Sequence, residues 1–181
     1  MIFAGVGLTL WLIPEPEAAW RAAVRLTARS SAVLLLLALL AESINRCWPS
    51  PFSHWALQNR RYIGLSFAAS HTIHAYTFLS LASLSAQLAQ AILTPSGLVI
   101  GAFGYGIIAV LVATSNDRAQ QLLGRIWWGR LHGVGVHLLC LQFLLGFLKH
   151  APEHPEDWAF AVLLLGALGL RWGVRRVRVS A

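Results

Sequence analysis

The sequence predicts an all-α membrane protein, a single bundle of five to six transmembrane helices, on three observations. Of its 181 residues, 57% are hydrophobic and only 12% are charged, whereas a soluble domain has about 25% charged residues. The mean hydropathy is +0.63. The apolar residues gather in separate stretches, and no polar linker is long enough to separate two domains. Residues 1–181 are therefore interpreted as one transmembrane helix-bundle domain.

The first two confident spans lie next to arginines. Residues 28–41 are the apolar core of the first span, and three arginines lie at its entrance: Arg21, Arg25 and Arg29. A loop containing Trp48 separates it from the second span, residues 62–84, which follows Arg60 and Arg61 directly. Tryptophan is typical of the interface between membrane and water, so we expect this loop at the membrane surface.

Three further spans are predicted at residues 98–113, 131–148 and 158–170. A turn at residues 94–97 precedes the third span, whose glycines permit close approach of helices. Residues 114–130 form the longest polar interval, in which Trp127 and Trp128 indicate an interface anchor. Residues 151–157 form an acidic loop before the fifth span.

The apolar residues 1–13 are too few for the roughly 20 residues that a membrane helix needs. Pro14 and Pro16 end this stretch. It lacks the basic start and the small-residue cleavage site of a signal peptide. Two interpretations stay open: part of a sixth span, or a segment that lies in the interface.

The positive charges predict the orientation. Alternating the five spans places ten basic residues on one side of the membrane: Arg46, Arg60, Arg61, Arg118, Arg125, Arg130, Arg171, Arg175, Arg176 and Arg178. The other side has four, namely Arg21, Arg25, Arg29 and Lys149. Basic residues are enriched in cytoplasmic loops, so we expect a multi-pass protein of a bacterial-type inner membrane with a cytoplasmic C-terminus. The arginines lie between apolar runs rather than on one soluble face, which argues against a nucleic-acid partner.

Two of the predicted spans contain two histidines each. Ionisable side chains within a span are costly and indicate a functional site. His71 and His74, in the second span, are three residues apart and share a helix face. His132 and His137, in the fourth span, are five apart and point about 140° away from each other. This arrangement predicts a metal or a heme between the two helices.

Depth in the membrane favours some pairings over others. His71 and His74 lie about 15 and 20 Å beyond the arginines that open their span, at about 1.5 Å per residue. His137 and His132 lie about 10 and 3 Å beyond the arginine that opens theirs. His137 therefore matches His71 or His74 in depth better than His132 does. His132 on its own is equally consistent with a helix-capping role.

Heme is favoured over zinc or an iron–sulfur cluster. Cys47 and Cys140 do not form a cysteine cluster, and imidazole is a common axial ligand of heme iron. A helix bundle also offers an apolar slot for the macrocycle. Arg60 and Arg61 are interpreted as topology signals that are also suited to neutralise heme propionates. The remaining histidines are expected in solvated loops: His54, His150 and His154.

Two motifs resemble the ferric reductase-like transmembrane domain family, and most of all its heme-binding membrane subunits of periplasmic methionine-sulfoxide reductase systems. They are RRYIGL, followed by His74, and TSNDRAQQLLGRIWWGRLH, which ends in His132. The resemblance covers residues 21–148. It implies a membrane b-type cytochrome subunit that passes electrons across the inner membrane from a flavoprotein or quinol donor to a separate periplasmic acceptor protein.

The resemblance further implies that His74 and His132 are heme ligands. In that family a second histidine usually follows the one matched by His132 by 13 residues, and here this position is Leu145. Two arrangements stay open. One keeps His132 with an unusual partner, and two hemes are then possible. The other, which we favour, is a single heme b bound by His137 and either His71 or His74.

The alternative function is a non-redox small membrane protein, either a transporter or a structural or assembly subunit, whose intramembrane histidines bind substrate or protons. Transporters more often have internal repeats and broken helices, and neither is clear in this sequence. No G-x-G-x-x-G motif follows a strand. The chain is therefore interpreted as an electron-transfer subunit rather than a complete enzyme.

Overall fold

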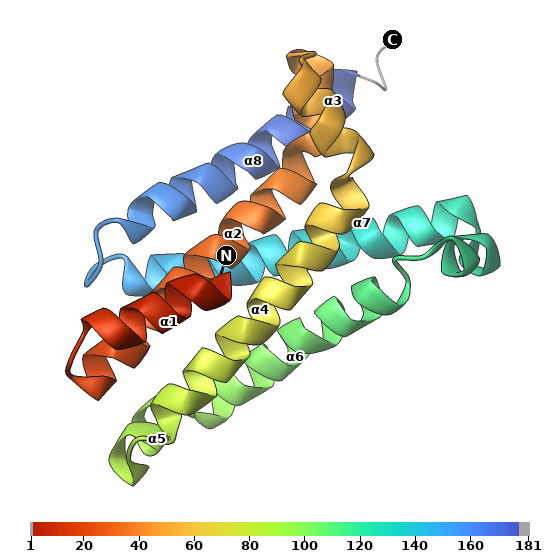
Figure 1. The fold of residues 1–181 in the computed structure, drawn as a ribbon. Coiled ribbons are helices and arrows are strands. Elements are labelled where there is room, and N and C mark those ends of the chain that lie inside the picture. The colour runs from red at the N-terminus through yellow and green to blue at the C-terminus, as the bar shows by residue number, and fades with distance from the viewer. Residues whose placement is uncertain (1, 178–181) are drawn as a thin grey trace.

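The computed structural model describes residues 2–177 of the chain. Over this range the protein is all helical, and each predicted span coincides with a helix (Figure 1). In chain order the helices are α1 (Ile2–Leu12), α2 (Pro16–Cys47), α3 (Pro51–Gln58), α4 (Arg60–Ala82), α5 (Ala86–Ile92), α6 (Pro95–Ala113), α7 (Asp117–His150) and α8 (Asp157–Val177).

Helix α2 is the centre of the bundle, because α1, α3, α4 and α8 all pack against it. Its start follows from two residues. Pro16 lacks an N–H group, which costs nothing in the first turn of a helix. The Glu15 carboxylate accepts hydrogen bonds from the backbone N–H groups of Glu17 and Ala18. Helix α2 therefore begins twelve residues before the apolar core at residues 28–41 that the sequence indicates.

The helix ends gather at two sides of the molecule, as alternating spans require. In Figure 1 the ends of α2 and α8 and the start of α4 lie together at the top. The turn between α1 and α2, the connection from α7 to α8, and helix α5 lie toward the lower left. Helix α1 runs beside α2 over only part of its length, because it has 11 residues.

The number of spans requires a correction. Among the described residues, three helices are long and apolar enough to cross a membrane by length and composition, namely α2, α6 and α7. This is fewer than the predicted five to six. Helix α4 has 23 residues, but two arginines and two histidines lower its hydropathy. Helix α1, with 11 residues, is too short. The all-α membrane class itself is confirmed.

Helix α7 begins earlier than predicted, inside the polar interval at residues 114–130. The side chain of Asn116 accepts a hydrogen bond from the Ala119 N–H and starts this helix. Gly124 then interrupts it with a φ of 72°, a conformation that glycine adopts without steric cost. The span proper follows this kink. Trp128 lies after it and donates its indole N–H to the Thr114 carbonyl at 2.8 Å, so this tryptophan joins α7 to the end of α6.

The apolar core lies where α2, α7 and α8 meet. Leu39, Leu139 and Leu164 come from these three helices and are fully buried. Cys140 is buried among them as a small core residue, and Cys47 is exposed. Burial of large aliphatic side chains from three helices at one place stabilises their mutual packing.

Arg171 also lies in this core, although the sequence predicts it among the basic residues on the cytoplasmic side. Its side chain is buried, and its guanidinium donates a hydrogen bond to the Leu39 carbonyl at 2.8 Å. The aliphatic stem of arginine packs well against apolar neighbours while its head bonds to polar atoms. The side chains of Arg175 and Arg176, and all of Arg178, lie outside the described residues.

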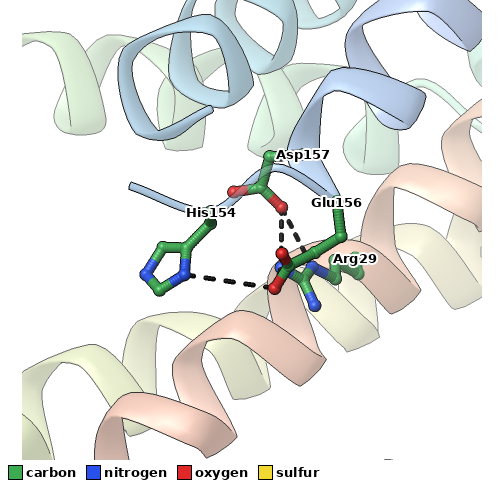
Figure 2. Close-up of polar contacts among 4 residues, drawn as sticks. All are labelled: Arg29, His154, Glu156 and Asp157. Atoms are coloured by element: carbon green, nitrogen blue, oxygen red, sulfur yellow. Dashed lines mark hydrogen bonds and ion pairs between the residues drawn. The ribbon is translucent and has the colours of Figure 1, made fainter. Parts of the chain in front are cut away.

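An ion cluster joins α2 to the start of α8 at the other side of the bundle (Figure 2). The Arg29 guanidinium lies 2.8 Å from Asp157 Oδ1 and 2.9 Å from Glu156 Oε1. His154 Nδ1 lies 4.0 Å from the same Glu156 oxygen. Hydrogen bonds from its own backbone and from Arg29 lower the pKa of Glu156. The stability that the ionised Glu156 carboxylate contributes is therefore present above the ordinary pKa of glutamate, and it is lost as the pH falls through the lowered pKa.

We expect Asp157→Ala to lower the free energy of unfolding by about 1–3 kcal/mol, because the partly buried guanidinium of Arg29 loses its main hydrogen-bond acceptor. The measurement is the thermal unfolding midpoint in detergent, followed by tryptophan fluorescence. Glu153→Ala, in the same loop but at an exposed position, is the matched control and should leave the midpoint unchanged. Equal midpoints for both variants would contradict a structural role for the cluster.

Candidate functional site

The two histidines of α4 lie on one face, as their spacing predicts. Their rings stack with centroids 5.0 Å apart and an angle of 19° between the ring planes. Residues three apart in a helix are neighbours on its surface, so this contact follows from the sequence alone. The sequence alone does not show which helices surround the pair. His71 faces α6 and α7, whereas His74 faces α2.

His71 is surrounded by aromatic rings from three helices. Phe67 of α4, Tyr105 of α6 and Phe143 of α7 place their ring centroids 5.7, 5.1 and 5.1 Å from its own. The Tyr105 hydroxyl donates a hydrogen bond to the backbone carbonyl of His71 at 2.7 Å. The Nδ1 atom of His71 is buried and has no hydrogen-bond partner within the described part of the chain. Packing, rather than hydrogen bonding, therefore positions this ring.

His74 is positioned by a hydrogen bond. Its Nδ1 lies 3.1 Å from Oγ1 of Thr27 on α2. Thr27 is fully buried, and its hydroxyl also lies 3.3 Å from that of Thr77, one turn beyond His74 on α4. The Thr77 hydroxyl donates to the His74 carbonyl at 2.9 Å. One threonine from each helix therefore lies beside the imidazole.

These contacts belong to a longer seam of small and hydroxyl residues between α2 and α4. One turn after Thr27, the hydroxyls of Ser31 and Ser70 meet at 2.8 Å. Both serines are buried, and Ala23 is fully buried one turn before Thr27. Small residues permit close helix approach, and hydroxyl groups hydrogen-bond across the interface. We call this interface the hydroxyl seam.

His132, on α7, contacts residues at the C-terminal end of α6. Its Nε2 is 2.9 Å from Thr114 Oγ1, and its ring stacks on Trp128 with centroids 4.2 Å apart. The Thr114 hydroxyl also bonds to the Val110 carbonyl at 2.7 Å. Arg60 lies close enough to His132 to interact with it electrostatically. In this conformation His132 joins the C-terminal end of α6 to α7.

His132 and His74 lie at different levels of the bundle. His132 precedes Phe143, which contacts His71, by eleven residues, or about 16 Å along a helix. On α6, Thr114 follows Tyr105 by nine residues, or about 13 Å. Both routes therefore place His132 more than two helical turns from the level of His71 and His74.

His137 lies on a different side of α7, as its predicted divergence of about 140° from His132 requires. Its Nδ1 bonds to the Gly133 carbonyl at 2.6 Å. It lines two grooves of about 340 and 650 Å³, both of which it shares with Trp172 of α8. The structure does not bring His137 into contact with His71 or His74. Leu145, at the position of the expected second histidine, is 59% exposed.

Both arginines that open α4 have partners. Arg60 donates a hydrogen bond to the Ala38 carbonyl at 2.9 Å and lies 3.8 Å from the Glu42 carboxylate. Arg61 lies 3.0 Å from the carboxylate of Asp117 at the start of α7. These contacts join the start of α4 to α2 and α7. The three histidines expected in loops lie away from the spans' interior, with His54 on the short helix α3, His150 at the end of α7 and His154 in the following loop.

No group of three or more His, Cys, Asp or Glu side chains able to hold a metal ion occurs among the described residues. A heme needs only one imidazole nitrogen on each face of the ring. His74 supplies such a nitrogen on one face, because a ring bonded through Nδ1 has Nε2 left for iron.

Thr27, Tyr105 and Phe143 are part of this site, and sequence reasoning missed all three. Thr27 had a detectable signal. It belongs to a run of small residues on α2 at intervals of four, namely Ala19, Ala23, Thr27 and Ser31, which is the pattern of a close helix interface. Tyr105 and Phe143 lie in apolar runs where aromatic residues are ordinary, so their contact with His71 has no signature in the sequence.

Comparison with known proteins identifies three similar bacterial proteins, each named "Protein-methionine-sulfoxide reductase heme-binding subunit MsrQ". The Klebsiella pneumoniae protein is 30% identical over 150 residues, which are 81% of this chain and 72% of that protein. The Salmonella enteritidis protein is 29% identical over 84% of this chain and 75% of its own length. The Cronobacter sakazakii protein is 28% identical over 84% and 74%. No family model matches the chain, and no solved structure matches it significantly.

We expect Ser31→Leu to lower the free energy of unfolding by about 1–3 kcal/mol, because the larger side chain overpacks the buried seam and removes the bond to Ser70. Val33→Leu adds bulk at an exposed position of the same helix and should have little effect. Thermal unfolding in detergent compares the two. A Ser31→Leu midpoint as high as that of Val33→Leu would show that α2 and α4 do not pack closely there.

Proposed function

The chain belongs to the family of MsrQ heme-binding subunits of protein-methionine-sulfoxide reductase, and we propose that it is a b-type cytochrome of the inner membrane. In this role it passes electrons across the membrane from a flavoprotein or quinol donor to a separate acceptor protein on the periplasmic side. The relatives' name supports heme binding and a reductase partner. The heme type, the donor, the acceptor and the direction of transfer are part of the proposal.

The observation that carries the proposal is the state of His74. A buried imidazole whose Nδ1 is bonded to a hydroxyl oxygen has the arrangement of an axial ligand, in which the second nitrogen is left for iron. Bound heme supplies a one-electron change between ferric and ferrous iron at that position. The protein's own residues supply the orientation of His74 through Thr27, and Phe67, Tyr105 and Phe143 pack around the neighbouring His71.

His74 is thus the ligand that the geometry supports best, within a single-heme arrangement. The second axial ligand is the less supported part. Pairing with His137 requires α7 to present its other side, because His137 now lines the groove beside Trp172. His132 lies about 16 Å along α7 from Phe143, which contacts His71. An iron bound to His132 would therefore lie at a different level of the bundle from His74. His71 stacks on His74 on the same face of α4, so the two imidazoles do not approach one iron from opposite sides, and His71 is the alternative to His74 as the ligand from α4.

Arg60 and Arg61 are proposed to set topology first. Their contacts with the Ala38 carbonyl and with Asp117 hold them at the start of α4, on the side where the predicted cytoplasmic arginines gather. Pairing with heme propionates, the other role predicted for these arginines, would require a heme nearer the start of α4 than His74, which lies about 20 Å along the helix. The cytoplasmic C-terminus follows from the same distribution of basic residues.

We expect His74→Ala to lower heme content to below about a tenth of the wild-type ratio, because it removes an axial ligand that no neighbour on α2 replaces. The measurement is the heme-to-protein ratio of the purified protein after heme-replete expression. His54→Ala, on α3, is the control and should keep the wild-type ratio. Unchanged heme loading in His74→Ala would defeat the assignment.

The second ligand is identified by the same ratio in three further variants. If His132 binds a second heme, wild-type protein contains about two hemes per chain and His132→Ala contains about one. If a single heme is shared with α7, His137→Ala loses it as fully as His74→Ala does. If His71 instead of His74 is the ligand from α4, His71→Ala loses the heme and His74→Ala keeps it. Wild-type protein without heme would remove the redox proposal and favour the non-redox alternative.

A further inference from the structure

Thr27 has more polar neighbours than a residue that only fills space. It is fully buried on α2, and its Oγ1 lies 2.9 Å from the Ala23 carbonyl and 3.0 Å from the Val24 carbonyl of its own helix. The same atom lies 3.1 Å from His74 Nδ1. A hydroxyl group has one proton to donate and two lone pairs to accept with, so these contacts determine where each proton lies.

The hydroxyl proton of Thr27 has an acceptor within its own helix. Threonine in a helix habitually donates to the carbonyl three or four residues earlier, and both of those carbonyls are nearer than the imidazole. The Thr77 hydroxyl donates to the His74 carbonyl in the same way. With both protons donated to backbone carbonyls, the Thr27 oxygen faces His74 as an acceptor. The proton of this hydrogen bond then comes from the imidazole, for which the Val24 carbonyl on α2 is a further acceptor.

From this geometry we propose that Thr27 is a positioning residue for heme binding. It accepts the Nδ1–H of His74, which fixes that tautomer and the ring orientation and leaves the Nε2 lone pair for iron. The inference rests on the proposed function, in which His74 is an axial ligand. It adds a role for a residue of another helix, 47 positions earlier in the chain than His74.

The hydrogen bond has a chemical consequence beyond orientation. An N–H that donates to an oxygen makes the imidazole a stronger electron donor through its other nitrogen. A stronger donor stabilises ferric over ferrous iron, so the bond lowers the midpoint potential of the heme. A residue that only packs against the ring has no such effect. The midpoint potential therefore separates a positioning role from a structural one.

His71 provides a contrast within the same helix. It lies one turn before His74, and its Nδ1 is buried without a hydrogen-bond partner within the described part of the chain. Its ring is stacked among Phe67, Tyr105 and Phe143. No acceptor fixes its tautomer. Of the two histidines on this face, only His74 has the supporting contact expected of a prepared ligand.

The test is Thr27→Val, which keeps the shape of the side chain and removes the acceptor. We expect heme affinity to fall by about 10–100-fold, as for other residues that support a metal ligand, and the midpoint potential of the remaining heme to rise. Thr27→Ser keeps the hydroxyl and should restore both values. If Thr27→Val fails to assemble, Thr27→Ala is compared with Thr27→Ser by the same two measurements.

Ser31→Ala is the matched control, because it removes a buried hydroxyl from the same seam, one turn away and bonded to Ser70 rather than to a histidine. It should lower the unfolding midpoint without moving the heme potential. If Thr27→Val and Ser31→Ala have the same heme content and the same potential while His74→Ala loses heme, Thr27 has only a packing role and the inference is overturned. Full heme loading in His74→Ala overturns the ligand assignment together with this inference.

Discussion

Polar groups inside a bilayer have no water to bond with and must be satisfied within the protein. The hydroxyl seam between α2 and α4 meets this constraint, and much of the structure depends on it. Thr27 and Ser31 on α2 bond to His74 and Ser70 on α4. These contacts hold α4 against α2, against which α1, α3 and α8 also pack. Helix α4 is too polar to qualify as a span on its own composition, and the seam provides its polar groups with partners.

The two ends of the bundle are held by charges of different kinds. At the end where α4 begins, Arg60 and Arg171 bond to two successive carbonyls of α2, those of Ala38 and Leu39. At the other end, Arg29 of α2 bonds to Asp157 at the start of α8. Helix α2 is therefore joined to α4 and α8 near Ala38 and Leu39, and to α8 a second time at Arg29. A rigid central helix suits a protein that must hold a ligand between helices.

Regular features of the site could be predicted from spacing, and contacts between distant helices could not. The three-residue interval between His71 and His74 correctly predicts a shared face, and the five-residue interval between His132 and His137 correctly predicts their divergence. The engagement of His132 with Thr114, and of His137 with a groove beside Trp172, depends on how α6 and α8 approach α7. Among the described residues three helices are long and apolar enough to span a membrane, fewer than the five to six predicted, and α4 is not among them because its polar residues, the histidines included, lower its hydropathy.

The short helices α3 and α5 escaped prediction for a related reason. Each lies beside serine or proline residues, and such residues indicate turns. Ser50 and Ser85 instead cap these helices through side-chain hydrogen bonds, and Pro51 occupies a first helical position, where it is tolerated. Gly124, in contrast, is a true interruption, with a φ that other residues rarely adopt.

The most direct test of the central claim is a reduced-minus-oxidised absorbance spectrum of the purified wild-type protein, recorded with its heme-to-protein ratio. We predict a b-type difference spectrum at about one heme per chain, as a single heme at His74 requires. A protein expressed with ample heme that shows no difference spectrum would contradict the account.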